Sequence, residues 1–113
     1  WQSAVQLDQN MEIPHRLEPT IFRLVQESLN NAAKHAQATE ISVSLKAQSD
    51  RLQLKVQDNG LGFDPNGIKR RGFGLSQMAD RVSATGGTFK IDSQPGNGTT
   101  IISLLPLQGT DNG

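Results

Sequence analysis

Hydrophobic residues recur at every second position in segments 41–45 and 52–56, with polar residues between them. This period of two is typical of strands that bury one face. Gln48–Asp50 lies between the two segments and indicates a hairpin turn. Weaker alternation, or a continuous apolar run, predicts three further strands, at residues 5–7, 89–91 and 99–105.

Two other segments have the period of a helix. The first runs from about Glu18 to Ala36, and Pro19 suits its opening turn. The second runs from Leu75 to Val82 and ends before Gly86-Gly87. In the first helix, the apolar residues that share one side are Ile21, Val25, Leu29, Ala32 and Ala36. The polar residues expected on the opposite side are Arg23, Glu27, Asn31 and Lys34.

The order of these elements is strand, helix, strand, strand, loop, helix, strand, strand. Connections of hairpin type predict an α/β fold, a two-layer sandwich in which a mixed, mainly antiparallel sheet carries its helices on one face. The length of 113 residues allows one domain with one modest core. We expect that domain at residues 1–107, followed by a frayed tail at 108–113.

Charge and composition narrow the function classes. Eleven basic and eleven acidic residues give a net charge of zero, so the domain has no overall field for nucleic acid or an anionic membrane. No cysteine is present, which removes disulfides, thiolate zinc sites and cysteine nucleophiles. No stretch is apolar for long enough to span a bilayer, and we expect a cytoplasmic location. Because the chain opens at Trp1 without methionine, we expect a piece of a longer protein.

Glu27, Asn31 and Lys34 are spaced at i, i+4 and i+7, so they form one stripe on the first helix. Magnesium prefers oxygen ligands and binds through few protein groups together with substrate phosphates. The amide oxygen of Asn31 suits that role, Lys34 can neutralise phosphate, and Glu27 can orient or deprotonate a water molecule. The alternative is an ordinary solvated helix face.

Asp58 continues the alternation of Leu52, Leu54 and Val56, which directs its carboxylate toward their face. A buried carboxylate needs a partner, and the exocyclic amine of adenine is a suitable donor. Such a bond contributes about 1.5–3 kcal/mol. The segment Asn59–Gly62 provides backbone that can approach a flat base closely. The alternative is an Asx-type turn that closes the strand.

Gly72-Phe73-Gly74 directly precedes the second helix and fits phosphate binding at a helix N-terminus. It matches neither a P-loop nor a dinucleotide fingerprint, and a glycine pair at this place can also be a hinge. Lys69–Arg71, in the long loop before it, suits a nucleotide lid or a solvated basic run. His35 can hydrogen-bond near phosphates or fill space beside the sheet.

These motifs resemble the catalytic and ATP-binding domain of sensor histidine kinases, within the GHKL superfamily that includes DNA gyrase, mismatch-repair and heat-shock chaperone ATPases. The similarity extends from about Leu17 to Pro106. The segments that resemble the N, G1 and G2 boxes and the closing Gly-Thr element are Glu27–His35, Asp58–Phe63, Gly72–Leu75 and Gly98–Thr100. The short G1–G2 spacing is similar to the short-lid subgroup of nitrate, cell-envelope and membrane-fluidity sensors.

The resemblance implies the left-handed Bergerat ATP-binding fold and roles for individual residues. Asn31 would coordinate Mg²⁺ and Asp58 would bind the adenine amine, with Thr99 supporting that contact. Lys34 and His35 would face the phosphates of ATP. Glycines and their neighbours in the G1 and G2 boxes would complete the site: Gly60, Gly62, Phe63, Gly72, Gly74 and Leu75.

The resemblance also implies an incomplete enzyme. In the family, the γ-phosphoryl group goes to a histidine on a separate dimerisation domain, and then to a response regulator; neither His15 nor His35 fits the acceptor pattern. We therefore expect a histidine kinase catalytic domain with little activity alone, a monomeric state for the isolated domain, and no direct contact with nucleic acid or membrane. Alternatives are an ATP hydrolase that uses Glu27, an anti-sigma-factor serine kinase, and a degenerate interaction module.

Overall fold

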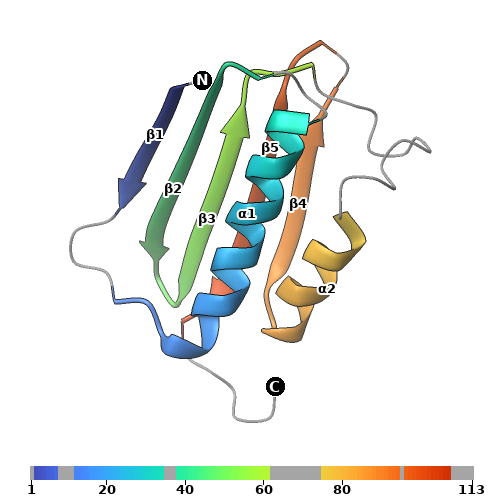
Figure 1. Cartoon of the computed structure of the whole chain (residues 1–113). Coiled ribbons are helices and arrows are strands. Elements are labelled where there is room, and N and C mark those ends of the chain that lie inside the picture. The colour runs from blue at the N-terminus through green and yellow to red at the C-terminus, as the bar shows by residue number, and fades with distance from the viewer. Residues whose placement is uncertain (1, 8–11, 35–37, 62–74, 95, 108–113) are drawn as a thin grey trace.

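The computed structural model describes residues 2–7, 12–34, 38–61, 75–94 and 96–107. Within these ranges the chain forms a five-stranded sheet with two helices on one face (Figure 1). The strands are β1 (Gln2–Leu7), β2 (Glu40–Gln48), β3 (Arg51–Asp58), β4 (Thr88–Ser93) and β5 (Thr99–Pro106). The helices are α1 (Glu18–Lys34), which follows the 3-10 turn η1 (His15–Leu17), and α2 (Leu75–Ala84). The predicted order of elements is confirmed.

The sheet is mixed and mainly antiparallel, as predicted. Its spatial order is β1-β2-β3-β5-β4. All neighbouring pairs are antiparallel except β1 and β2, which are parallel and joined through α1. Figure 1 shows this β1–α1–β2 connection as left-handed, the hand that the family resemblance implies and an exception to the usual right-handed crossover. α1 consequently packs on β2 and β3 and beside α2.

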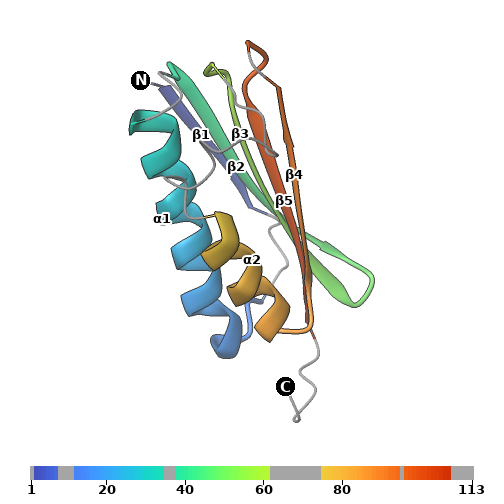
Figure 2. The same ribbon diagram turned by 90° about the vertical axis from the view of Figure 1, so that its right-hand side faces the viewer.

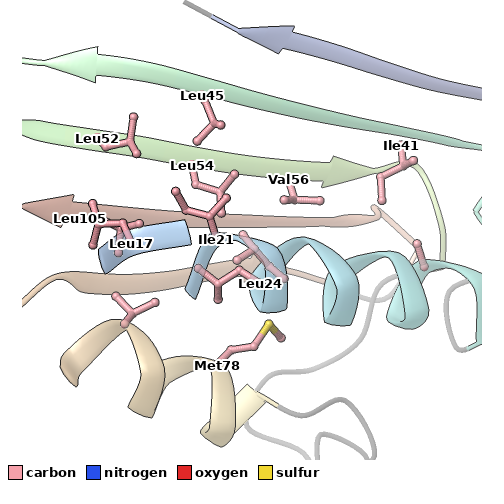
Figure 3. Close-up of a cluster of buried hydrophobic side chains, with 13 residues drawn as sticks. Leu17, Ile21, Leu24, Ile41, Leu45, Leu52, Leu54, Val56, Met78 and Leu105 are labelled. Atoms are coloured by element: carbon pink, nitrogen blue, oxygen red, sulfur yellow. The ribbon is translucent and has the colours of Figure 1, made fainter. Parts of the chain in front are cut away.

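The two helices cover the same side of the sheet, and the opposite side carries no helix in the described part of the chain (Figure 2). Between the layers lies a core of aliphatic side chains from both helices and from β2, β3 and β5 (Figure 3). Leu52, Leu54 and Val56 are all buried, which confirms the predicted alternation of β3. Burying such side chains supplies most of the stabilisation of a domain of this size.

The face that α1 buries differs from the predicted one. The buried residues of α1 are Ile21, Leu24, Ser28, Asn31 and Ala32. Val25 and Leu29 lie only at the margin of the core. Ser28 can occupy the centre because its hydroxyl donates to the Leu24 carbonyl at 2.6 Å, which satisfies a polar group that would otherwise count against burial. The buried stripe of α1 is thus rotated relative to the predicted one. The prediction placed Asn31 on the solvated face, whereas the structure buries it. Ala36 lies outside the described residues.

The end of α2 follows the local sequence closely. Gly86 has φ of +85°, a conformation that glycine adopts without strain. Its N–H donates to the Ser83 carbonyl at 2.9 Å, and the Gly87 N–H donates to the Val82 carbonyl at 3.1 Å. This pair of bonds is a Schellman motif, so the Gly-Gly pair ends the helix as expected. None of the described helices is both long and apolar enough to cross a membrane.

Candidate functional site

Three polar residues lie side by side where three neighbouring strands meet one end of the sheet. Asp58 of β3 is opposite Thr99 of β5, and Thr99 is opposite Ser93 of β4. Residues opposite one another share a face of the sheet. Here that face is the one covered by the helices, because Asp58 is in phase with the buried residues Leu54 and Val56. Asp58, Thr99 and Ser93 therefore form a polar row at the edge of the apolar face that the helices cover.

Asp58 is held by backbone donors on both sides. The Gly60 N–H donates to Asp58 Oδ1 at 2.8 Å, and the Thr99 N–H also donates to the carboxylate. The side chain is half-buried, and burial raises its pKa above the ordinary value of 3.8, while the two backbone bonds act in the opposite direction. The bond to Gly60 is the Asx-type contact considered as an alternative. It leaves other lone pairs of the carboxylate for a ligand.

Asn59 connects the end of β3 to the start of β2 through hydrogen bonds. Its Oδ1 accepts from the N–H groups of Thr39 at 3.0 Å and Glu40 at 2.9 Å. Its Nδ2 donates to Thr39 Oγ1 at 3.0 Å, and its own N–H donates to the Glu40 carbonyl at 3.2 Å. These bonds fix the backbone directly after Asp58. Sequence reasoning treated Asn59 only as part of a loop and missed this role.

The turn between β4 and β5 is tied to the same end of the sheet. Ser93 Oγ donates to the Gly98 carbonyl at 3.1 Å and lies 2.8 Å from Thr99 Oγ1. Ser93 and Thr99 are both buried, at 6% and 7% exposure. The Gly96 N–H donates to the Leu61 carbonyl, which joins the turn to the loop that follows β3.

Gly98 occupies a place where no larger residue fits. Its φ is +75°, and a Cβ atom there would lie 2.3 Å from the carbonyl oxygen of Asp58. Real Cβ atoms do not approach backbone that closely. Gly98–Thr100 is the segment that resembles the closing Gly-Thr element of the family. Its glycine has a physical reason, because only glycine lets β5 begin directly against the backbone of Asp58.

α1, in the other layer, carries the predicted site residues Glu27 and Asn31. Figure 1 places the C-terminal end of α1 at the same end of the molecule as the ends of β3 and β4. Asn31 is 9% exposed and Glu27 is half-buried, whereas Asn30, which directly precedes Asn31, is exposed. The burial of Asn31 shows that a solvated helix face does not describe this residue, whereas the predicted role of the stripe stays a prediction.

Several predicted site residues fall outside what the structure describes. His35, Gly62, Phe63, Gly72 and Gly74 lie outside the described residues, as do Lys69–Arg71. Lys34 and Leu75 are placed only as the last residue of α1 and the first of α2. Their proposed contacts with phosphate, and the short lid between the two glycine motifs, stay predictions.

Ser93 is a member of the polar row that sequence reasoning did not identify. It follows Phe89 and Ile91 at the apolar phase of β4, just as Asp58 follows the apolar residues of β3. A polar residue at the buried phase of a strand end requires a polar partner. The same signal therefore appears twice in this chain.

The side chains that could act as metal ligands fit magnesium bound together with a nucleotide better than a metal ion held by protein side chains alone. In the described residues, no three His, Cys, Asp or Glu side chains gather as ligands. Mg²⁺ keeps waters and uses one or two protein oxygens with substrate phosphates, so a single buried amide is compatible with it.

Comparison with known proteins agrees with this arrangement. "Sensor protein VraS" of Staphylococcus epidermidis is 38% identical over 104 residues, which are 92% of this chain and 30% of that protein. "Signal transduction histidine-protein kinase/phosphatase DegS" of Brevibacillus brevis is 40% identical over 94 residues, covering 83% of this chain and 24% of that protein. The chain thus spans about a third or less of these relatives.

Solved structures share the fold. The "blue-light activated histidine kinase" EL346 of Erythrobacter litoralis matches 94% of this chain and 35% of its own with a TM-score of 0.79 at 24% identity. The histidine kinase AdeS of Acinetobacter baumannii matches 96% of this chain and 55% of its own with a TM-score of 0.74 at 17% identity. The family model "Histidine kinase-, DNA gyrase B-, and HSP90-like ATPase" matches residues 17–109, and the chain belongs to that family.

Proposed function

We propose that this chain is the ATP-binding catalytic domain of a sensor histidine kinase, which binds magnesium–ATP and presents its γ-phosphate to a histidine elsewhere in the kinase. The half-buried Asp58 carboxylate at the end of β3 is the observation on which this proposal chiefly rests. The names of the relatives support the choice of a sensor kinase over other members of the family.

Asp58 recognises the base in this proposal. Two backbone N–H groups orient its carboxylate and leave acceptor positions toward the ligand. An adenine amine is a donor, whereas the corresponding guanine group is an acceptor. Because the carboxylate accepts only, ATP should bind in preference to GTP.

Asn31 is the proposed magnesium ligand, with Glu27 one turn earlier to orient water. A neutral amide oxygen adds no charge to a site that already holds a polyphosphate, and burial on α1 restricts the rotamers of Asn31. Mg²⁺, when bound, neutralises phosphate charge. The phosphates of ATP would be held by Lys34, His35 and the segment Gly72–Leu75.

Phosphoryl transfer depends mainly on positioning and charge neutralisation. In this proposal the nucleophile belongs to the dimerisation and phosphoacceptor domain of the parent kinase, and a response regulator receives the phosphoryl group afterwards. We propose a cytoplasmic site for the reaction and a monomeric state for the domain alone.

Calorimetric titration with ATP, GTP and ADP, with and without Mg²⁺, tests the proposal. Adenine-selective, magnesium-sensitive binding with negligible turnover is expected. Rapid hydrolysis would instead favour an ATP hydrolase, and a folded protein that binds no nucleotide would contradict the proposal.

Two variants assign the roles. Asp58→Asn should weaken ATP binding by about tenfold or more, because it removes the charge and replaces one of the two acceptor oxygens with an NH2 donor. Asp92→Asn makes the same change on the exposed side of β4 and is the control. Asn31→Ala should reduce the magnesium dependence of binding, whereas the exposed neighbour Asn30→Ala should not. Unchanged titrations in folded Asp58→Asn and Asn31→Ala would remove these residues from the site.

A further inference from the structure

Three lysines surround an apolar strip on the face of the sheet that the described helices leave uncovered. Figure 2 shows this face on the side away from α1 and α2. Lys55 of β3 is opposite Ile102 of β5, and Ile102 is opposite Lys90 of β4. In the next row of the same face, Lys46 of β2 and Leu104 of β5 lie on either side of β3. The lysine surface consists of these five residues: Lys46, Lys55, Lys90, Ile102 and Leu104.

The lysines of this surface have no ion-pair partner among the described residues. The acidic strand residues of the same face, Glu40 and Asp92, lie toward the end of the sheet where β3 finishes. Asp50, which directly precedes Arg51, lies in the turn at the other end. The middle of the face is therefore positively charged, although the whole chain has a net charge of zero.

The centre of the lysine surface is apolar. Ile102 and Leu104 alternate along β5 with residues that are buried beneath the helices, so their own side chains belong to the opposite face. Both are half-buried, and both stand outside the core between the two layers. An apolar centre with a polar or charged rim is the usual arrangement of a protein–protein interface. This face therefore offers apolar contact and positive charge together.

The spacing of the lysines matches the width of a helix. β3 and β4 lie on either side of β5, so the backbones at Lys55 and Lys90 are two strand spacings apart, about 10 Å. An α-helix with its side chains is about 10–12 Å wide. A helix that lies along β5 would therefore have a lysine within reach of each flank.

We propose that the lysine surface binds an acidic amphipathic helix of a partner protein. The apolar stripe of this helix would cover Ile102 and Leu104. Carboxylates on its two flanks would pair with Lys46 and Lys55 on one side and with Lys90 on the other. Exposed ion pairs contribute little affinity singly, so the lysines mainly select the partner by charge while the apolar strip holds it. The surface is on the face opposite to the proposed nucleotide site, so the inference goes beyond the proposed function and does not rest on it.

A synthetic helical peptide of about twenty residues, with a leucine stripe flanked by glutamates, is the probe. Titration of the isotope-labelled domain, followed by NMR, should shift the backbone amides of Lys55, Lys90 and Ile102 and leave those of α1 and α2 unchanged. A matched peptide with lysine in place of every glutamate should not bind, because like charges would then meet across the surface.

Paired charge reversals test the role of the lysines. Lys55→Glu combined with Lys90→Glu should weaken peptide binding by about tenfold, because each reversal replaces an attraction with a repulsion. Arg23→Glu combined with Arg81→Glu is the matched control. It makes the same change in net charge at exposed positions of the two helices and should alter the affinity by no more than about twofold. Ile102→Thr, which keeps a β-branched residue in the strand, should also weaken binding.

Circular dichroism and the ATP titration should be the same for all these variants and the wild type. Equal peptide affinity in the two charge-reversed proteins, or amide shifts confined to α1 and α2, would overturn the inference. Binding to vesicles of phosphatidylserine and phosphatidylcholine without binding to the peptide would overturn it in favour of an anionic membrane. Self-association on sedimentation that the reversals at Lys55 and Lys90 abolish would overturn it in favour of a second copy. A protein that binds the peptide but not ATP would support the inference and contradict the proposed function.

Discussion

Replacing Gly98 by alanine tests how closely β5 begins against Asp58, the residue that we propose binds the base. The added Cβ would lie 2.3 Å from the Asp58 carbonyl oxygen and 3.3 Å from the Asn59 Cα atom. Both atoms are backbone and have no rotamer by which to withdraw. Gly96, in the same turn, has φ of +88° with no atom within 4 Å of its virtual Cβ. Gly96→Ala therefore has the backbone strain without the clash.

The two substitutions can be given separate magnitudes. A left-handed conformation costs an alanine about 1–2 kcal/mol relative to glycine, and this applies to both positions. Overpacking that forces backbone to shift adds about 1–3 kcal/mol, and this applies to Gly98 alone. Gly98→Ala should thus lower the free energy of unfolding by about 2–5 kcal/mol and Gly96→Ala by about 1–2 kcal/mol.

Urea unfolding followed by circular dichroism measures the difference, and thermal melting should agree at about 4–8 °C per kcal/mol for a domain near this size. Binding provides a second readout. Gly98→Ala should weaken ATP because the clash displaces Asp58, whereas Gly96→Ala should bind normally when folded. Equal losses of stability in the two variants, with equal ATP affinity, would refute the close approach as a determinant of the site.

Three further predictions concern single groups. Ser103→Ala should leave the free energy of unfolding unchanged or raise it by up to about 1 kcal/mol, because the buried hydroxyl lacks a partner in the described structure; a loss above 1 kcal/mol on urea unfolding would contradict this. Asn59→Ala should cost about 1–3 kcal/mol through the lost bonds to Thr39 and Glu40, whereas Asn59→Asp keeps the Oδ1 acceptor and should cost less in the same assay. Burial raises the pKa of Asp58, so the folded protein holds this proton more tightly than the unfolded chain. The contribution of Asp58 should therefore lower stability as pH rises through the range just above 3.8, and this part of the pH profile should be absent in unliganded Asp58→Asn; identical profiles would contradict it.

Most of the fold could be predicted because its strands bury one face and its helices one stripe. The alternation of Leu52, Leu54 and Val56 located β3 and the phase of Asp58, and Gly86-Gly87 located the end of α2. The prediction was wrong about the buried face of α1. Its periodicity was assigned from apolar residues alone, while Ser28 enters the core by bonding to its own helix and Leu24 lies deeper than Val25.

The sequence by itself determined the types of element and their order, since these depend on local period and turn propensity, and it predicted candidate site residues from the identity of their side chains. Only the tertiary structure decided that β5 lies between β3 and β4, because strand order depends on contacts between segments far apart in the chain. That order places Thr99 between Asp58 and Ser93, and it brings Gly98 so close to the Asp58 carbonyl that only glycine fits there.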